Sequence, residues 1–253
     1  MSDNRVIQLK DARATLHFPG GKKVFAAPMG VSPHGGHLAY SRNGDRALVI
    51  RSLVDGYVRR VPGFIVPPGR VTLTVSPLGH FVGLREQKAD APLRIANTLT
   101  GAVSTLPPQW SIISFTPDAS RMLVHTDGYG DEVAVYDLRT STVVRRIGPA
   151  HALSGDGDTL ATRIVDGGTW ITFTSLSKGT EVRPRIPVPT HNVYLAWNRS
   201  GTLTMRLAVV KGPWRNYSAY DRWVFDPRTG KTRKADRVVI PRGLRAHRVA
   251  GFS

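Results

Sequence analysis

Short runs rich in Val, Ile, Thr, Leu, Tyr and Phe recur along the whole chain, and turns containing Gly, Pro, Asn or Asp separate them. Apolar and polar residues alternate within many of these runs, as they do in β-strands with one buried face. Long stretches with the spacing of an apolar helix face are missing. The pattern therefore predicts an all-β protein made of many short strands.

A tetrapeptide that follows a short apolar run recurs five times, and successive copies begin 44, 40, 38 and 44 residues apart. Further alternating runs and polar turns follow each copy in the same order. Self-similarity at this period indicates a repeat architecture. The copies are Ser32-Pro33-His34-Gly35, Ser76-Pro77-Leu78-Gly79, Thr116-Pro117-Asp118-Ala119, Ser154-Gly155-Asp156-Gly157 and, more loosely, Asn198-Arg199-Ser200-Gly201.

The third unit shows the order of strands within a repeat most clearly. We expect strands over Ser111–Phe115, Arg121–His125, Glu132–Leu138 and Thr142–Ile147. Four antiparallel strands in a unit of about 40 residues are typical of a β-propeller blade, because such a small sheet buries its faces only against its neighbours around a ring.

The two ends of the chain complete the count of blades. Residues 13–28 are expected to form two strands around a Pro-Gly-Gly turn, and residues 247–253 match the first strand of a blade. We therefore expect a six-bladed β-propeller with four antiparallel strands per blade, in a single domain over residues 1–253. Its sixth blade is shared between about 1–28 and 245–253, so that a C-terminal strand pairs with N-terminal strands and closes the ring.

These motifs resemble the TolB-type, WD-repeat-like six-bladed β-propellers. The resemblance rests on the Ser-Pro-x-Gly turns at Ser32 and Ser76, on Thr116-Pro117-Asp118, and on the late-blade segments 135–140 and 224–230. It covers essentially the whole chain, although the Trp-Asp dipeptide of true WD repeats is absent. Propellers of this kind serve as scaffolds, ligand-binding domains and adjuncts to enzymes, so the resemblance implies the fold and leaves the function open.

Composition is that of a folded protein, with 41% hydrophobic residues and 25 glycines among 253 residues. The absence of cysteine excludes disulfides, zinc–thiolate sites and thiol nucleophiles. Neither an apolar stretch of membrane-spanning length nor a secretory leader is present, so we expect a cytoplasmic protein without a membrane span.

The charge is strongly positive and unevenly distributed. The formal net charge is +17, from 27 Arg and 8 Lys against 18 acidic residues, and residues 206–248 hold 12 basic and three acidic residues. Such a field attracts nucleic acid, an anionic membrane or an acidic protein. A bias toward arginine codons in the genome explains the same composition without a function.

An unusually long turn between the second and third strands of the fifth unit is the most distinctive local feature. It extends from Lys211 to Trp223, where equivalent turns are short, and it interleaves aromatic residues with arginine. Aromatic side chains and guanidinium groups together favour binding hot spots and stacking on single-stranded nucleic acid. The candidate partner-binding residues are Lys211, Trp214, Arg215, Tyr217 and Arg222. Alternatively, Tyr220 and Trp223 begin the next strand and belong to the core.

No motif for catalysis, a metal or a cofactor is found, so we expect no catalytic residue, no metal site and no cofactor. The acidic turns at 127–132 and 156–158 are interpreted as ordinary turns. His151 and His191 lie near predicted inner strands or blade connections and are expected to approach the central channel.

The sequence thus favours a non-catalytic scaffold that binds an acidic macromolecular partner, most simply a protein within a larger assembly. Direct nucleic-acid binding is the first alternative, supported by charge alone. The second is a hydrolase or lyase that uses the channel mouth. The oligomeric state stays open.

Overall fold

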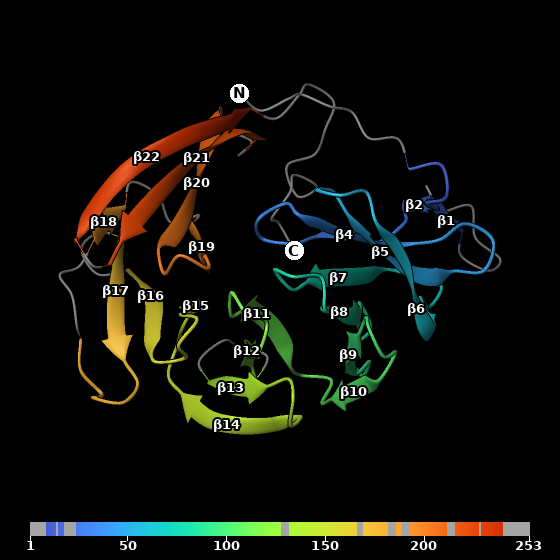
Figure 1. Ribbon diagram of the computed structural model, residues 1–253, viewed down its shortest axis with the longest axis horizontal. Coiled ribbons are helices and arrows are strands. Elements are labelled where there is room, and N and C mark those ends of the chain that lie inside the picture. The colour runs from blue at the N-terminus through green and yellow to red at the C-terminus, as the bar shows by residue number, and fades with distance from the viewer. Residues whose placement is uncertain are drawn as a thin grey trace.

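The computed structural model contains only β-strands as regular elements within the residues that it describes. These strands form five four-stranded sheets and one two-stranded sheet, and every pairing is antiparallel. Figure 1 shows the five larger sheets following one another around an arc, with the first strand of a sheet toward the centre and the fourth toward the outside. The described residues are 9–13, 15–17, 24–127, 132–165, 169–181, 186–188, 193–211, 216–227 and 229–239.

Each large sheet is built from four strands that are consecutive in the sequence. The first sheet contains β3 (Met29–Val31), β4 (His37–Ser41), β5 (Ala47–Ser52) and β6 (Val58–Ile65), and the second contains β7 (Val71–Val75), β8 (Phe81–Glu86), β9 (Leu93–Asn97) and β10 (Val103–Leu106). The third contains β11 (Ser111–Phe115), β12 (Arg121–His125), β13 (Val133–Asp137) and β14 (Thr142–Ile147), and the fourth contains β15 (Ala152–Leu153), β16 (Thr159–Val165), β17 (Thr169–Ser175) and β18 (Ile186–Val188). The fifth contains β19 (Val193–Trp197), β20 (Leu203–Lys211), β21 (Asn216–Asp226) and β22 (Lys231–Val239).

The strands predicted for the third unit are confirmed. Three of them have the predicted bounds, and β13 is one residue shorter at each end than expected. Just before β13, the backbone N–H of Glu132 donates to the carboxylate of Asp127 at 3.0 Å, while its carbonyl accepts the N–H of Thr126 at 3.0 Å. The all-β class and the four-stranded antiparallel sheets are confirmed as well.

The repeated tetrapeptide is explained by one hydrogen bond that recurs in the first turn of every large sheet. The side-chain oxygen of its first residue accepts a backbone N–H from the residue that opens the second strand or just precedes it, and this satisfies a donor that the turn leaves unpaired. The bonds are Ser32 to His37 at 3.0 Å, Ser76 to Phe81 at 3.0 Å, Thr116 to Arg121 at 3.0 Å, Ser154 to Thr159 at 2.8 Å and Asn198 to Thr202 at 3.0 Å.

Apolar side chains fill the space between neighbouring sheets. One buried cluster joins the first sheet to the second, and three others join the second to the third, the third to the fourth and the fourth to the fifth. Between the last two sheets, the rings of Phe173 and Phe225 stack with centroids 4.8 Å apart, and Trp197 meets Phe173 edge-on at 6.1 Å. Burial between successive sheets is the packing expected of propeller blades.

The other face of the first sheet is covered by the beginning of the described chain. Tyr40 and Val49 pack there with Leu9 and Ala12, and the Tyr40 hydroxyl donates a hydrogen bond to Asp11 at 2.7 Å. Residues 9–13 therefore lie on the side of the first sheet that faces away from the second, where the sixth blade is expected.

The sixth blade itself is described only in part. β1 (Thr15–His17) and β2 (Val24–Ala26) form an antiparallel pair, as predicted for residues 13–28. Residues 245–253, which were expected to supply the closing strand, lie outside the described residues. Because the described residues form five four-stranded sheets and no closed ring, the count of six blades stays a prediction. No helix capable of crossing a membrane occurs among the described residues.

Candidate binding face on the fifth sheet

The fifth sheet differs from the others in the length of its outer strands. β20 and β22 each have nine residues and β21 has eleven, whereas the fourth strands of the other sheets have three to eight. Figure 1 shows these long strands, in orange and red, at one end of the arc of sheets.

The segment predicted as a long exposed loop is mostly strand, so that prediction is wrong for residues 216–223. β20 continues to Lys211 and β21 begins at Asn216, and the two residues pair in register. A bulge between Val209 and Val210 lets the hairpin continue past the sheet's usual length. Along β20 the apolar residues Leu203, Met205, Leu207 and Val209 recur at every second position, which favours a strand that continues over a loop.

The structure places three of the five candidate residues on this hairpin. Lys211 ends β20, Tyr217 pairs with Val210 on β21, and Arg222 lies farther along β21 opposite Asp236 of β22. Trp214 and Arg215 lie outside the described residues.

The core interpretation of two neighbouring aromatic residues is confirmed. Tyr220 is buried, and Trp223 packs against the cluster between the fourth and fifth sheets. Both residues therefore belong to the packing of the fifth sheet.

Arg222 is engaged by an acidic neighbour on the next strand. Its Nε and Nη2 donate to the two carboxylate oxygens of Asp236, at 3.0 and 2.6 Å. Both side chains are close to half exposed, at 45% and 44%. A pair this open to solvent contributes little to stability, and its charges stay accessible to a partner.

A second carboxylate on the same hairpin, that of Asp221, forms ion pairs with two cations. Arg237 donates from Nε and Nη2 to Asp221 at 2.6 and 2.8 Å, and Lys234 Nζ lies 3.0 Å from Asp221 Oδ1. The hydrogen bond from Arg237 is the largest cause that lowers the pKa of Asp221, to about 2. Asp221 is therefore ionised at neutral pH, yet one carboxylate cannot neutralise two cations.

Two further cations on β22 have no carboxylate partner among the described residues. Lys231 and Arg233 are exposed, and their side chains take part in none of the described ion pairs. We call Lys231, Arg233, Lys234 and Arg237 the basic edge. The four cations lie within seven residues of the sequence, whereas the predicted contact was placed on the aromatic turn.

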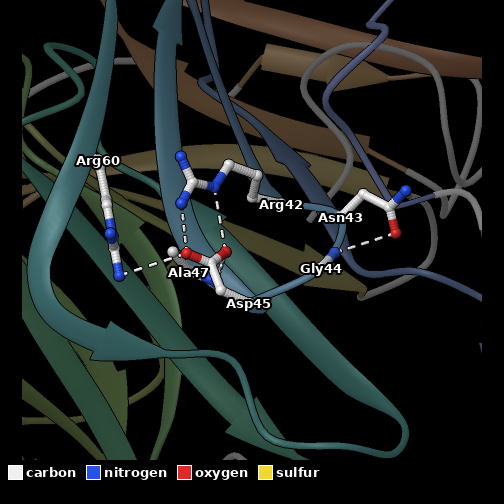
Figure 2. A network of polar contacts seen from close by, with 6 residues as sticks. All are labelled: Arg42, Asn43, Gly44, Asp45, Ala47 and Arg60. Atoms are coloured by element: carbon white, nitrogen blue, oxygen red, sulfur yellow. Dashed lines mark hydrogen bonds and ion pairs between the residues drawn. The ribbon is translucent and has the colours of Figure 1, made fainter.

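In the first sheet, too, one carboxylate faces two cations. In Figure 2, Asp45 accepts from Arg42 Nε and from the backbone of Ala47, and Arg60 Nη2 lies 3.3 Å from the same carboxylate. The side-chain hydrogen bond from Arg42 is the main cause that holds the pKa of Asp45 well below its usual range. Nearby, the side chain of Asn43 accepts the N–H of Gly44 at 3.1 Å and shapes the short turn.

The outer strand of the third sheet is similar in this respect. Arg146 forms an ion pair with Glu132, and Arg145 Nη1 donates to the carbonyl of Leu176 at 2.7 Å. β22 carries four cations, whereas β6 and β14 carry two each, so the excess of cations is largest on the outer strand of the fifth sheet.

A cavity of about 140 Å³ is lined by residues from the first, second, third and fifth sheets and by His151, which precedes β15 of the fourth. No Asp or Glu is among its described lining, so it contains no acid–base pair there. His151 reaches this cavity as expected, and burial lowers its pKa to about 4. His191 lies outside the described residues, within which no three metal-ligating side chains come together.

No family model matches the chain, and no curated protein matches it. Among solved structures, the chain is similar to TolB from Acinetobacter baumannii, with 14% sequence identity and a TM-score of 0.52. The similarity covers 87% of this chain and 58% of that chain, so the chain corresponds to little more than half of that protein's length. At this identity the likeness concerns the fold alone, and the chain has a TolB-like β-propeller fold.

Proposed function

We propose that the protein is a non-catalytic β-propeller scaffold that binds an acidic protein through its fifth sheet. The observation that carries this proposal is the basic edge, where Lys231 and Arg233 are exposed without a carboxylate partner among the described residues. The hairpin residues Lys211, Trp214, Arg215 and Tyr217, together with Arg222, extend the proposed contact beyond β22.

Two contributions to binding are expected to act at different distances. The net charge of +17 and its concentration near the C-terminal end attract an acidic surface from afar and raise the association rate. Close contact then depends on aromatic anchors, for which Trp214 and Tyr217 are the proposed candidates, because buried aromatic residues dominate interface energies. The outer strands β6 and β14 carry only two cations each, against four on β22.

Nucleic-acid binding is the second candidate, and the same cations favour it. The two functions differ in their response to salt. Binding to phosphates weakens by orders of magnitude between low and moderate salt, and it does so for many sequences alike. An interface anchored by buried aromatic residues is expected to persist at moderate salt.

The test compares three double variants with the wild type in a nuclease-treated pull-down from the native host at moderate salt. Lys231→Gln with Arg233→Gln removes the unpaired charges of the basic edge, and Trp214→Ala with Arg215→Ala removes the predicted anchors. Lys88→Gln with Arg139→Gln removes the same charge as the first variant at exposed positions of the second and third sheets.

We expect one acidic protein to be recovered with the wild type and with the Lys88 and Arg139 variant. It should be lost, or weakened about tenfold or more, with either fifth-sheet variant. Equal loss of the acidic protein with all three variants would mean that net charge alone accounts for its binding. If a parallel pull-down without nuclease recovers nucleic acid and no acidic protein, nucleic-acid binding is favoured instead.

A further inference from the structure

β22 forms the outer edge of the fifth sheet, and among the described residues only one of its two sides has a strand partner. The order of strands in this sheet is β19, β20, β21 and β22, and β22 pairs in register with β21. Alternate residues of such an edge direct their backbone N–H and C=O groups outward. These groups form a row of donors and acceptors with which a further extended chain can pair.

The outer strands of the other sheets provide less of an edge. β10 has four residues, and β18 has three, of which Pro187 has no backbone N–H. In β6 the register with β5 shifts between Arg60 and Ile65, which interrupts the strand. β14 has six residues, against nine in β22. β22 is therefore the longest continuous outer edge among the described strands.

The cations of the basic edge lie on both faces of β22. Lys231 and Arg233 are two residues apart, so their side chains share one face of the strand, at a spacing of roughly 7 Å. Lys234 and Arg237 share the opposite face, since both contact the carboxylate of Asp221. A bulge in the pairing with β21 lies between these two residues and allows their common orientation.

The face with Lys231 and Arg233 keeps its charge available to a partner. Both residues are exposed, and neither takes part in an ion pair among the described residues. Thr232, which lies between them, is exposed as well. This stretch of the edge is therefore open to solvent, with two positive charges on alternate residues.

The charge of the edge determines which kind of strand can pair with it. β22 contains four cations and one carboxylate, so pairing with a second copy of β22 would bring mostly cations opposite cations. Like charges on directly opposite residues destabilise a sheet, whereas opposite charges stabilise it. The edge therefore disfavours self-association and favours an acidic strand.

We propose that the acidic partner binds by adding an extended segment to β22 as a further strand, with carboxylates on alternate residues facing Lys231 and Arg233. This inference rests on the proposed function and specifies how its partner is recognised. Main-chain hydrogen bonds supply affinity, and the two cross-strand ion pairs select a segment with acidic residues two positions apart. Apolar or β-branched residues between the carboxylates suit the extended conformation.

The test uses synthetic peptides as probes, so it does not require the natural partner. In the first peptide, of about eight residues as in a long strand, Glu alternates with Val or Thr. Two derivatives carry backbone N-methyl groups, one on every Glu and the other on every intervening residue. Because alternate N–H groups of an added strand face β22, one derivative should bind about tenfold or more weakly, and the other less than about threefold. Fluorescence anisotropy of the labelled peptides at low salt gives the affinities.

Variants locate the peptide on the protein. Lys231→Gln with Arg233→Gln should weaken binding of the first peptide by about five- to tenfold. Lys88→Gln with Arg139→Gln removes the same charge at exposed positions of other sheets and should weaken it by less than about twofold. Lys231→Glu with Arg233→Glu should reverse the preference, toward a peptide in which Lys replaces Glu. A circular dichroism spectrum like that of the wild type shows that each variant is folded.

Absence of binding by the first peptide, or equal affinities of the two methylated peptides, would mean that no strand is added, and the proposal would be wrong. Equal weakening by the two charge-neutralising variants would place the peptide elsewhere than on β22 and would also overturn it. If the pull-down nevertheless depends on Lys231 and Arg233, the proposed function stands without this mode of binding. Peptide binding with the expected pattern, together with a pull-down that recovers no acidic protein, would instead count against the proposed function alone.

Discussion

Arg206 on β20 donates a hydrogen bond to the carbonyl of Pro33, which lies 173 residues earlier in the first turn of the first sheet. The neighbouring His34 also meets the fifth sheet, through a hydrogen bond with the backbone of Trp197. Burial lowers the pKa of His34, with a smaller contribution from Arg206. The two ends of the arc of sheets therefore touch at the channel.

This contact should be measurable in the stability of the protein. Replacement of Arg206 by Gln is expected to lower the free energy of unfolding by about 1–3 kcal/mol, because a charged hydrogen bond between distant parts of the chain is lost. Arg145→Gln removes the same type of bond, to the carbonyl of Leu176, on an exposed outer strand. Its cost should stay below about 1 kcal/mol. Urea denaturation compares the two, and equal costs would contradict the prediction.

The first-turn hydrogen bonds should matter more than similar bonds on the surface. Ser76 is fully buried and its hydroxyl accepts the N–H of Phe81, so Ser76→Ala leaves that donor unpaired. We expect a loss of about 1–3 kcal/mol in the free energy of unfolding. Ser104→Ala breaks an exposed bond with Ser141 and should cost less than about 0.5 kcal/mol. A Ser76 variant as stable as the Ser104 variant would refute this role.

The fourth position of the first turn should resist an exchange between Gly and Ala in the second sheet and tolerate it in the third. Gly79 has φ +68°, and a Cβ there would lie 2.7 Å from Cδ2 of His37. Gly79→Ala should therefore cost about 2 kcal/mol or more, since it combines backbone strain with a clash. At the same position of the third sheet, Ala119 has φ 57°. For Ala119→Gly, relief of strain offsets the lost buried methyl group, and we expect a change below about 1 kcal/mol. Thermal and urea unfolding of both variants give the comparison.

Stability should fall on acidification because of His151. Its pKa is about 4 in the folded protein and 6.5 in its ordinary state, mainly through burial and secondarily through Arg163 and His125. The unfolded chain therefore takes up the proton first, and the stabilisation present above pH 6.5 is lost as the pH falls toward 4. Between pH 7 and pH 5 the loss attributable to His151 is about 2 kcal/mol.

His151→Asn places an acceptor near the position of Nδ1 and removes the titration. Urea unfolding at the two pH values should show a shallower dependence for the variant than for the wild type. Burial lowers the pKa values of His34 and His80 as well, and these two groups act in both proteins alike. The pKa of His125 is also lowered by burial, but His125 contributes to the shift of His151, so a smaller part of the difference comes from that coupling. Parallel pH dependences of the two proteins would count against the assignment.

Removal of an acidic neighbour should strengthen the proposed protein interaction. Asp236→Asn frees Arg222 from its bidentate pair and adds one positive charge to the fifth sheet. We expect the acidic partner to bind about two- to tenfold more tightly at low salt, and less so at high salt. Stability should change by less than about 1 kcal/mol, because the pair is exposed.

Asp90→Asn is the control for this variant, since it makes the same change of charge on an exposed turn of the second sheet. Titration of the partner onto immobilised protein gives both affinities. Equal gains for the two variants would assign the effect to net charge and not to the fifth sheet.

The regular part of the fold could be predicted because its determinants are local. Alternation within strands and the Ser or Thr of each first turn act over a few residues, so the strands of the third unit agree with prediction within one residue. The extent of the hairpin in the fifth sheet was predicted less well, because the turn was expected to reach Trp223, whereas β21 already begins at Asn216. A bulge between Arg222 and Trp223 interrupts the alternation of the strand there.

The candidate sites depend on information that one strand does not contain. Which cations of β22 are neutralised follows from the register with β21, and that register includes a bulge between Arg222 and Trp223. Likewise, Ser114, His151 and Trp197 line one cavity only through the arrangement of three sheets. Their spacing in the sequence does not indicate that they border the same cavity.

The recurring first-turn bond also bears on how the chain folds. Each of these bonds closes within four or five residues, and each large sheet is made of consecutive strands. Hairpins of this kind form quickly because their contacts join residues that are close in the sequence. Folding can therefore nucleate at any of the five units and spread to its neighbours. The bond between Arg206 and Pro33 closes a loop of 173 residues, and such a long loop has a high entropic cost of closure. We therefore expect the contact between the first and fifth sheets to form late in folding.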